Sequence, residues 1–331
     1  MRLRVEYFVL PGILTGCVAA EPEEAAVADA TASQVEIVTD VVYGHKFGMA
    51  LTLDVYRPAQ PNGAGVAFMN SGGWFSPVME FHVEDDGRLR MRSDAELRGQ
   101  GRPAPKEGVE AGADPSQFSP RTLLENGFTV YNVRHGDGRK FLLPEVVEDV
   151  RYAIRFIRET APDYGVDPER LGLWGGSAGA HLSLLLGTTP EIAPGAAEET
   201  AQSEASVAAV VAYFPATDLA ALRPNAARWT QENFGVDLLT FFKALGYPEE
   251  QDPEFSPVHY ATAGDPPTLI IHGDQDPLAP LSHGQRMHDA LREAGAVSEL
   301  IVIEGGVHGF RGDDADFALA QAVEWFQRHL Q

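Results

Sequence analysis

The sequence is poor in cysteine, in positive charge and in long apolar runs, and each shortage excludes something. Its one cysteine, Cys17, can form neither an intramolecular disulfide nor a C-x-x-C metal site. There are 25 Lys and Arg against 48 Asp and Glu, and the formal net charge of −23 argues against a nucleic-acid partner. Beyond the N-terminal segment there is no run of about 20 apolar residues, so we expect no internal transmembrane helix.

What is present has the composition of a globular protein. The chain has 331 residues, of which 44% are hydrophobic and 22% charged, enough for one large core or two small ones. The acidic balance favours solubility, and at low salt it repels strongly polyanionic substrates.

The N-terminal segment has the layout of an export signal. Two arginines precede a short apolar segment, and an acidic, Ala-rich stretch follows. The tetrapeptide LTGC, residues 14–17, resembles the bacterial lipoprotein box. The resemblance implies a signal peptide over 1–17, cleavage before Cys17, lipidation of its thiol and a membrane-anchored protein in the cell envelope. Residues 18–34 would then form a flexible linker. The alternative is an ordinary signal peptide in which Cys17 is merely a small residue.

From residue 35 onward, strand-like and helix-like segments alternate. This alternation predicts an α/β fold with a largely parallel sheet and helices on both faces. The first two strands, joined by a Gly-containing turn, add an antiparallel hairpin at the edge. We expect strands at 35–44, 49–58, 65–70, 128–135, 170–176, 207–214, 268–273 and 298–306, and helices at 120–127, 143–161, 180–187 and 316–330.

Two segments interrupt this alternation. Residues 78–118 are polar and rich in Gly and Pro, and they could form a lid or a surface excursion. Residues 219–257 carry an aromatic cluster, and we expect a cap-like insertion that shapes the substrate site. In α/β sheets, ligands bind outside the carboxyl ends of the strands, so insertions there tend to cover the site.

The strongest local signal is Gly175-Gly176-Ser177-Ala178-Gly179, a G-x-S-x-G motif between a predicted strand and a predicted helix. That context predicts a sharp turn that lifts the Ser177 hydroxyl above the sheet as a nucleophile. The alternative is a phosphate-binding loop or a plain turn. No Lys follows as in a P-loop, so we favour the nucleophile.

A serine nucleophile needs a general base and an acid to orient it. His308, in a Gly-rich loop after the last predicted strand, is our candidate for the base. The acid is Asp276 or Asp274, both in the loop after the preceding strand, and we prefer Asp276 because it sits deeper in that loop. Asp218 is a reserve candidate.

The segments GGSAGAHLS, HGDQDPLAP and GGVHGF, in this order and spacing, resemble those of α/β-hydrolase-fold serine esterases and lipases. The similarity is to the hormone-sensitive-lipase-like and feruloyl and acetyl-xylan-esterase-like branches, and it covers residues 35–331. It implies an α/β-hydrolase catalytic domain with Ser177 as nucleophile, Asp276 as acid and His308 as base. It also implies no metal and no organic cofactor.

An acyl-transfer site also needs N–H donors for its oxyanion. In the resembled family one donor follows the nucleophile, here Ala178, and others come from a glycine loop after the third strand. The segment NSGGW occupies that place, so we expect Gly72 and Gly73 to form the rest of the oxyanion hole. Asn70 and Ser71 stand where relatives carry His and Gly.

Further residues are candidates for the substrate pocket. They are Trp74, His181 and Asp218; for His181, one helical turn past the nucleophile, a structural role is the alternative. His272 ends a strand and is expected to be buried, whereas His135 and His82 could line the site.

Together these features predict a serine hydrolase that cleaves carboxylic esters through an acyl-enzyme. We expect its substrates to be carbohydrate or small-molecule esters. One alternative is a serine peptidase or lactone hydrolase on the same fold. Another is a catalytically inactive, surface-anchored binding protein, which a missing triad member would favour.

Overall fold

A computed structural model describes residues 35–76, 81–83, 89–91, 115–189 and 206–330 of the chain. The predicted signal peptide, the linker 18–34 and Cys17 lie outside the described residues, as does most of the 78–118 insertion. No helix in the described ranges is both long and apolar enough to cross a bilayer.

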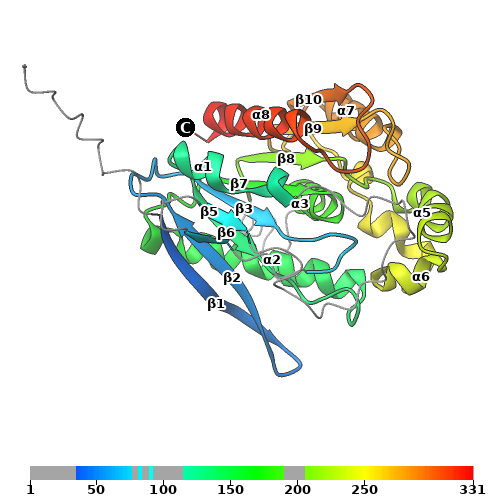
Figure 1. Cartoon of the computed structure of the whole chain (residues 1–331), viewed down its shortest axis with the longest axis horizontal. Helices are drawn as coiled ribbons and strands as arrows, with labels where there is room; N and C mark the ends of the chain where they lie inside the picture. The colour runs from blue at the N-terminus through cyan, green and yellow to red at the C-terminus, as the bar shows by residue number, and fades with distance from the viewer. Residues whose placement is uncertain (1–34, 77–80, 84–88, 92–114, 190–205, 331) are drawn as a thin grey trace, which may run out of the picture. The chain divides into compact units, whose positions relative to one another are not determined.

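The fold is built on a mostly parallel sheet whose strands, across the described residues, follow the order β1-β2-β6-β3-β7-β8-β9-β10 (Figure 1). β2 is antiparallel to both β1 and β6, and the remaining pairs are parallel. The predicted edge hairpin and parallel sheet are therefore confirmed. The strand bounds are β1 Glu36–Lys46, β2 Met49–Arg57, β3 Gly65–Met69, β6 Thr129–Val133, β7 Leu171–Gly176, β8 Ala209–Tyr213, β9 Thr268–Gly273 and β10 Ser298–Ile303, and a separate pair is β4 Phe81–Val83 and β5 Leu89–Met91.

The central strands are mostly apolar and buried along their whole length because helices cover both faces of the sheet. β3, β6, β7, β8 and β9 are buried at every position. The α-helices are α1 Arg121–Glu125, α2 Leu143–Thr160, α3 Ala178–Thr188, α5 Leu219–Asn233, α6 Leu238–Phe241, α7 Ser282–Ala294 and α8 Asp313–His329, and the 3₁₀ turns are η1 Pro115–Phe118, η2 Ala161–Tyr164, η3 Lys243–Leu245, η4 Glu249–Phe255 and η5 Pro257–His259.

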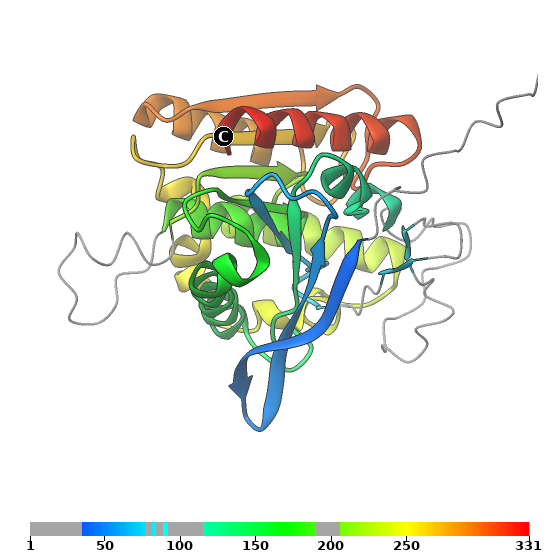
Figure 2. The ribbon, with the colours of Figure 1, turned by 90° about the vertical axis from the view of Figure 1, so that its left-hand side faces the viewer.

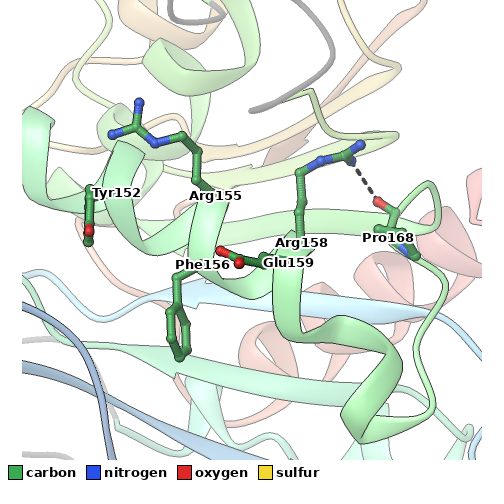
Figure 3. A pocket seen from close by; sticks show the side chains of 6 residues that line it. All are labelled: Tyr152, Arg155, Phe156, Arg158, Glu159 and Pro168. Carbon is green, nitrogen blue, oxygen red and sulfur yellow. Dashed lines mark hydrogen bonds between the residues drawn. The ribbon is translucent and has the colours of Figure 1, made fainter.

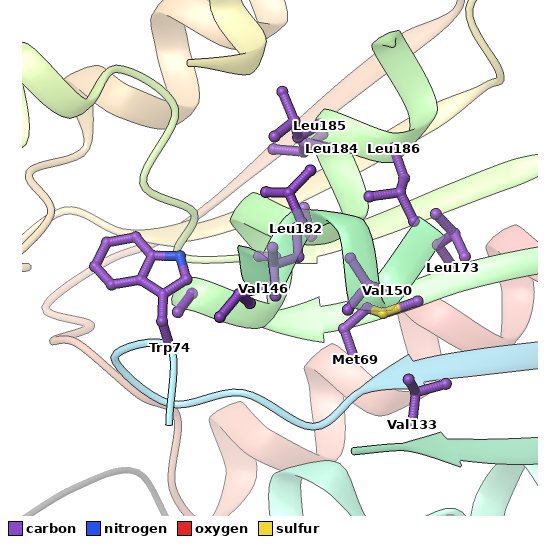
Figure 4. Packing of buried hydrophobic residues seen from close by; sticks show 14 of the residues in the cluster. Met69, Trp74, Val133, Val146, Val150, Leu173, Leu182, Leu184, Leu185 and Leu186 are labelled. Carbon is purple, nitrogen blue, oxygen red and sulfur yellow. The ribbon is translucent and has the colours of Figure 1, made fainter. Parts of the chain in front are cut away.

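Two hydrophobic cores lie on opposite sides of the sheet. One receives buried side chains from α2, α3 and α7, and the other from α1 and α8. Figure 2 shows the ribbon of these helices around the sheet. In the first core, Met69 and Leu173 from the strands pack with Val150 of α2 and Leu182 of α3 (Figure 4).

The segment 219–257 contains α5, α6, η3 and η4, which lie beyond the carboxyl ends of β3 and β8 (Figure 1). A buried ion pair closes this segment on itself. Arg223 of α5 binds both carboxylate oxygens of Asp252 in η4, at 2.7 and 2.8 Å, and donates to the carbonyl of Leu245 at 3.1 Å. The Tyr247 hydroxyl donates to the same carboxylate at 2.8 Å. The pair therefore fixes the α6–η3 stretch between its two partners.

Asp252→Ala should lower the free energy of unfolding by about 3–5 kcal/mol, because it leaves the Arg223 charge buried without its partner. The matched control is Glu299→Ala, which breaks the exposed pair with Arg328 and should cost no more than ~1 kcal/mol. Urea unfolding of both variants measures the difference. Equal losses would show that the buried pair does not hold this segment.

Candidate active site

Ser177 lies at the tip of a sharp turn between β7 and α3, with φ of 54° and ψ of −119°. Residues other than glycine rarely adopt this backbone conformation, so the surroundings of Ser177 must enforce it. A Cβ on Gly175 would lie 2.5 Å from the carbonyl carbon of Gly179, and a Cβ on Gly179 would overlap the carbonyl oxygen of Met69. The turn is therefore possible only with glycine on both sides of the serine.

Ser177, His308 and Asp276 form a continuous chain of hydrogen bonds. The Ser177 Oγ lies 2.8 Å from the Nε2 of His308, and the Nδ1 of His308 lies 2.7 Å from the Oδ2 of Asp276. His308 follows β10, Asp276 follows β9, and the Phe214 ring packs edge-on against the imidazole with a centroid separation of 4.9 Å. The loops after three parallel strands thus meet at one edge of the sheet.

The surroundings of Asp276 keep its carboxyl group ionised. Burial alone would raise its pKa, but His308, with His272 behind it, holds the pKa of this carboxyl well below its usual range. Its other oxygen accepts the N–H groups of Leu278 and Ala279, both at 2.9 Å. An ionised carboxylate in this position fixes the imidazole so that Nε2 faces the serine.

The two competing acids have other roles. Asp274 accepts the N–H of Gly305 at 2.7 Å and so joins the loops after β9 and β10. Asp218 caps α5 by accepting the N–H of Ala221 at 3.1 Å, and it pairs with Arg286 at 2.6 Å. Burial would raise the pKa of Asp218, but these two partners lower it. Asp218 does not line the pocket beside Ser177, so its assignment to the pocket is corrected.

The segment NSGGW forms a tight two-residue turn. The N–H of Phe75 donates to the carbonyl of Gly72 at 3.2 Å, and the N–H of Gly72 donates to the carbonyl of Phe75 at 3.1 Å. Between them Gly73 and Trp74 both have positive φ, 62° and 58°, as the central residues of a type I′ turn require. The prediction for Gly72 is therefore corrected: its N–H serves the turn, and Gly72 does not line the pocket.

Gly73 and Ala178 do line the pocket beside Ser177 and His308. Ala178 is the first residue of α3, so its N–H has no acceptor within the helix. Among the described residues, no acceptor pairs with the N–H of Gly73. Two N–H donors are thus available next to the serine. The Ser71 carbonyl accepts the N–H of Gly179 at 3.1 Å, which attaches this loop to the serine turn.

The remaining walls of the pocket are apolar, and sequence reasoning missed most of them. Leu278 and Ala279 directly follow Asp276, and Phe242 belongs to the aromatic cluster of the predicted cap. Nothing in the sequence distinguishes the others from ordinary core. The pocket has a volume of only about 10 Å³, and its apolar lining consists of Trp74, Ala216, Leu222, Phe242, Leu278 and Ala279.

His181 does not reach this pocket, so its assignment as a pocket residue is corrected in favour of the structural alternative. It is fully buried, and Trp74 donates its indole N–H to the Nδ1 of His181 at 3.2 Å. The Nε2 of His181 lies 2.6 Å from the carbonyl oxygen of Phe255. Burial lowers the pKa of His181 to about 4, so the ring is neutral at physiological pH.

The other histidines lie outside the pocket or outside what can be described. His272 is buried, as expected, and its Nε2 lies 2.8 Å from the Ala279 carbonyl. His135 is buried against the carbonyl of Gly136 and does not line the pocket. His82 is placed only as a position in β4. Among the described residues, no group of three His, Cys, Asp or Glu is arranged to hold a metal ion.

A second, more open groove of about 520 Å³ lies along α2 (Figure 3). It shares no residue with the pocket beside Ser177. One of its walls is fixed by Arg158, which donates to the Pro168 carbonyl at 2.6 Å. The groove is lined by Tyr152, Arg155, Phe156, Arg158, Glu159 and Pro168.

The fold and the Ser-His-Asp arrangement define an α/β-hydrolase, the class that the sequence motifs predict. The BD-FAE family model matches residues 109–291, more than half of the chain, and the chain belongs to this family.

Curated relatives agree with this class. Esterase LipQ of Mycobacterium tuberculosis is 28% identical over 53% of this chain and 41% of its own length. The ethyl acetate hydrolase of Pseudomonas putida is 24% identical over 93% of this chain and 88% of its own. The acetylxylan esterase of Xylanibacter ruminicola is 26% identical over 54% of this chain and 33% of its own. The chain thus spans less than half the length of two of these three relatives.

Solved structures share the fold. A truncated carbohydrate esterase from gut microbiota superposes with a TM-score of 0.63 and 23% identity, covering 89% of this chain and 96% of that one. A thermophilic esterase from Thermogutta terrifontis gives a TM-score of 0.59 and 23% identity, covering 89% and 92%.

Gly73→Ala should reduce kcat by roughly 10²-fold or more, the scale of losing one oxyanion donor. Its new Cβ would lie 2.8 Å from the Phe242 ring at a φ of +62°, so the turn must move. Gly48→Ala is the matched control, because Gly48 also has positive φ but no atom lies within 4 Å of the added Cβ. Steady-state kinetics on an acetyl ester measures both. Equal activity of the two variants would exclude Gly73 as a donor.

Proposed function

We propose that the chain hydrolyses carboxylic esters through an acyl-enzyme on Ser177. The observation that carries this proposal is the unbroken hydrogen-bonded chain from Ser177 through His308 to the buried carboxylate of Asp276. The curated relatives, which bear esterase and hydrolase names, support it. A complete chain of this kind also argues against the inactive binding protein.

In the first half of the reaction, Ser177 Oγ attacks the ester carbonyl while Nε2 of His308 takes the hydroxyl proton. Asp276 stabilises the imidazolium that forms, and it stays ionised because its pKa is low. The carbonyl oxygen becomes an oxyanion, and we assign the N–H groups of Gly73 and Ala178, which line the pocket, as its donors. His308 then gives its proton to the departing alcohol, which leaves the acyl group on Ser177.

In the second half, a water molecule takes the place of the alcohol. His308 accepts a proton from this water as it attacks the acyl carbonyl, and the oxyanion forms again at the same two N–H groups. When it collapses, Ser177 recovers its proton from His308 and the carboxylic acid is released. No metal or organic cofactor takes part in these steps.

The acyl group in this proposal is short. The pocket beside Ser177 is lined by Phe242, Leu222 and Leu278, and its volume of about 10 Å³ is near the space of one water molecule. An acetyl methyl fits such a space, whereas each further methylene must displace a wall. One of the relatives is named for ethyl acetate and another for acetylxylan, which supports the same choice. Export and attachment through Cys17 remain part of the proposal on the N-terminal sequence alone.

A fluorophosphonate probe should label the folded parent protein on Ser177 and should not label Ser177→Ala. The reason is that the probe reacts with a serine only when a base and N–H donors activate it. Intact-mass measurement detects the adduct, and peptide mapping locates it. A folded parent that stays unlabelled, or that is labelled on another serine, would contradict the proposed nucleophile.

Across p-nitrophenyl esters, kcat/KM of the parent should fall steeply from acetyl to butyryl. Phe242→Ala should flatten this dependence, because it removes a ring that lines the pocket. Leu239→Ala, on an exposed position of α6, is the control and should keep the profile of the parent. A parent that accepts hexanoyl esters as well as acetyl esters, or an unchanged profile in Phe242→Ala, would contradict the short-acyl pocket.

A further inference from the structure

The turn that carries Gly73 is held in a strained conformation. Trp74 has a φ of 58°, in the left-handed region that bulky side chains avoid. Such residues persist only where the surroundings determine their conformation. Here the N–H of Gly138 donates to the Trp74 carbonyl at 2.9 Å. That contact holds the backbone of Trp74 from one side, and the side chain of Trp74 needs a separate anchor.

His181 provides that anchor, and its hydrogen bonds fix its tautomer. The indole N–H of Trp74 can only donate, so the Nδ1 of His181, 3.2 Å away, must be the bare acceptor. The proton is therefore on Nε2, which donates to the Phe255 carbonyl at 2.6 Å. Because burial lowers the pKa of His181 to about 4, this arrangement persists through the neutral range.

The ring of His181 joins three parts of the site. His181 stands on α3 one turn after the serine, and its backbone N–H donates to the Ser177 carbonyl at 2.9 Å. It meets the Trp74 ring edge-on, with centroids 5.6 Å apart. Through Phe255 it also contacts the end of η4, in the segment that supplies Phe242. The indole points from its turn towards α3 (Figure 4).

We propose that His181 is a positioning residue for the oxyanion hole. Through the Trp74 indole it holds the strained turn, and so keeps the N–H of Gly73 aligned with the N–H of Ala178. This inference rests on the proposed function, since it assigns the residue that orients one of its donors. The proposed role of His181 requires an acceptor and a donor on opposite edges of its side chain, and Gln is a substitution that can supply both.

Trp74→Phe tests this directly, because it keeps an aromatic ring and removes the N–H. We expect kcat on an acetyl ester to fall roughly tenfold, less than the ~10²-fold or more of losing a donor outright, with KM little changed. The inhibition constant of an acetyl-derived trifluoromethyl ketone, whose adduct carries the oxyanion, should rise by the same factor. Trp325→Phe is the matched control, since it removes a buried indole N–H that donates to the Pro267 carbonyl at 3.3 Å, away from the pocket.

His181 itself is tested with Gln and Leu. His181→Gln should retain much of the activity, whereas His181→Leu should lose at least as much as Trp74→Phe. In the Trp74→Phe, His181→Leu double variant the losses should not add, because both changes break one contact. If His181→Leu does not fold, as thermal unfolding would show, the Trp74→Phe and His181→Gln measurements decide.

The outcomes separate this proposal from the proposed function. A parent without fluorophosphonate labelling would refute the esterase. An active parent whose Trp74→Phe variant matches Trp325→Phe in kcat and in ketone inhibition would overturn the role of His181. Fully additive losses in the double variant would do the same, because His181 and Trp74 would then act independently.

Discussion

The active site depends on one close backbone contact, where the first turn of α3 meets the loop after β3. The N–H of Gly179 donates to the Ser71 carbonyl, and no side chain fits between Gly179 and Met69. This contact brings the serine turn and the glycine turn together, although they lie about a hundred residues apart in the sequence. Without it Ser177 and Gly73 would belong to unrelated loops. Hydrogen bonds from His308 and from the indole of Trp74 then complete an arrangement whose spacing the backbone already sets.

The sequence predicted the strands, most helices and the three residues of the hydrogen-bonded chain because these follow local rules. The glycines around Ser177 indicate a tight turn, and polar residues after buried strands indicate the edge of the sheet where ligands bind. The choice between Asp274 and Asp276 needed the structure, since residues two apart in one loop differ only in where their side chains point. Gly72 was predicted wrongly because the partner of a backbone N–H is a property of the folded turn.

Other parts of the fold and of the site could not be predicted from the sequence, for different reasons. The helix α7 was not predicted, since its buried face consists of His283, Gly284, Met287 and Leu291 and carries little apolar periodicity. The pocket walls come from three separate segments whose apolar residues resemble any core. Two of these walls, Leu222 and Phe242, belong to the segment that the buried pair of Arg223 and Asp252 closes, and that pair is a long-range contact. The position of His181 in the sequence left a pocket role and a structural role open, and its tautomer and its link to Trp74 appear only in three dimensions.

The position of β10 has a consequence for how the site responds to stress. Among the described strands, β10 lies at one edge of the sheet and pairs with β9 alone, whereas β7, which leads to Ser177, lies between β3 and β8. Edge elements open locally at a lower free energy than central ones. We therefore expect the part of the sheet that carries the base to open more readily than the part that carries the nucleophile. The hydrogen bond between Asp274 and Gly305 holds the loops after β9 and β10 together at that edge. The catalytic lifetime of the molecule and its resistance to global unfolding are therefore separate quantities.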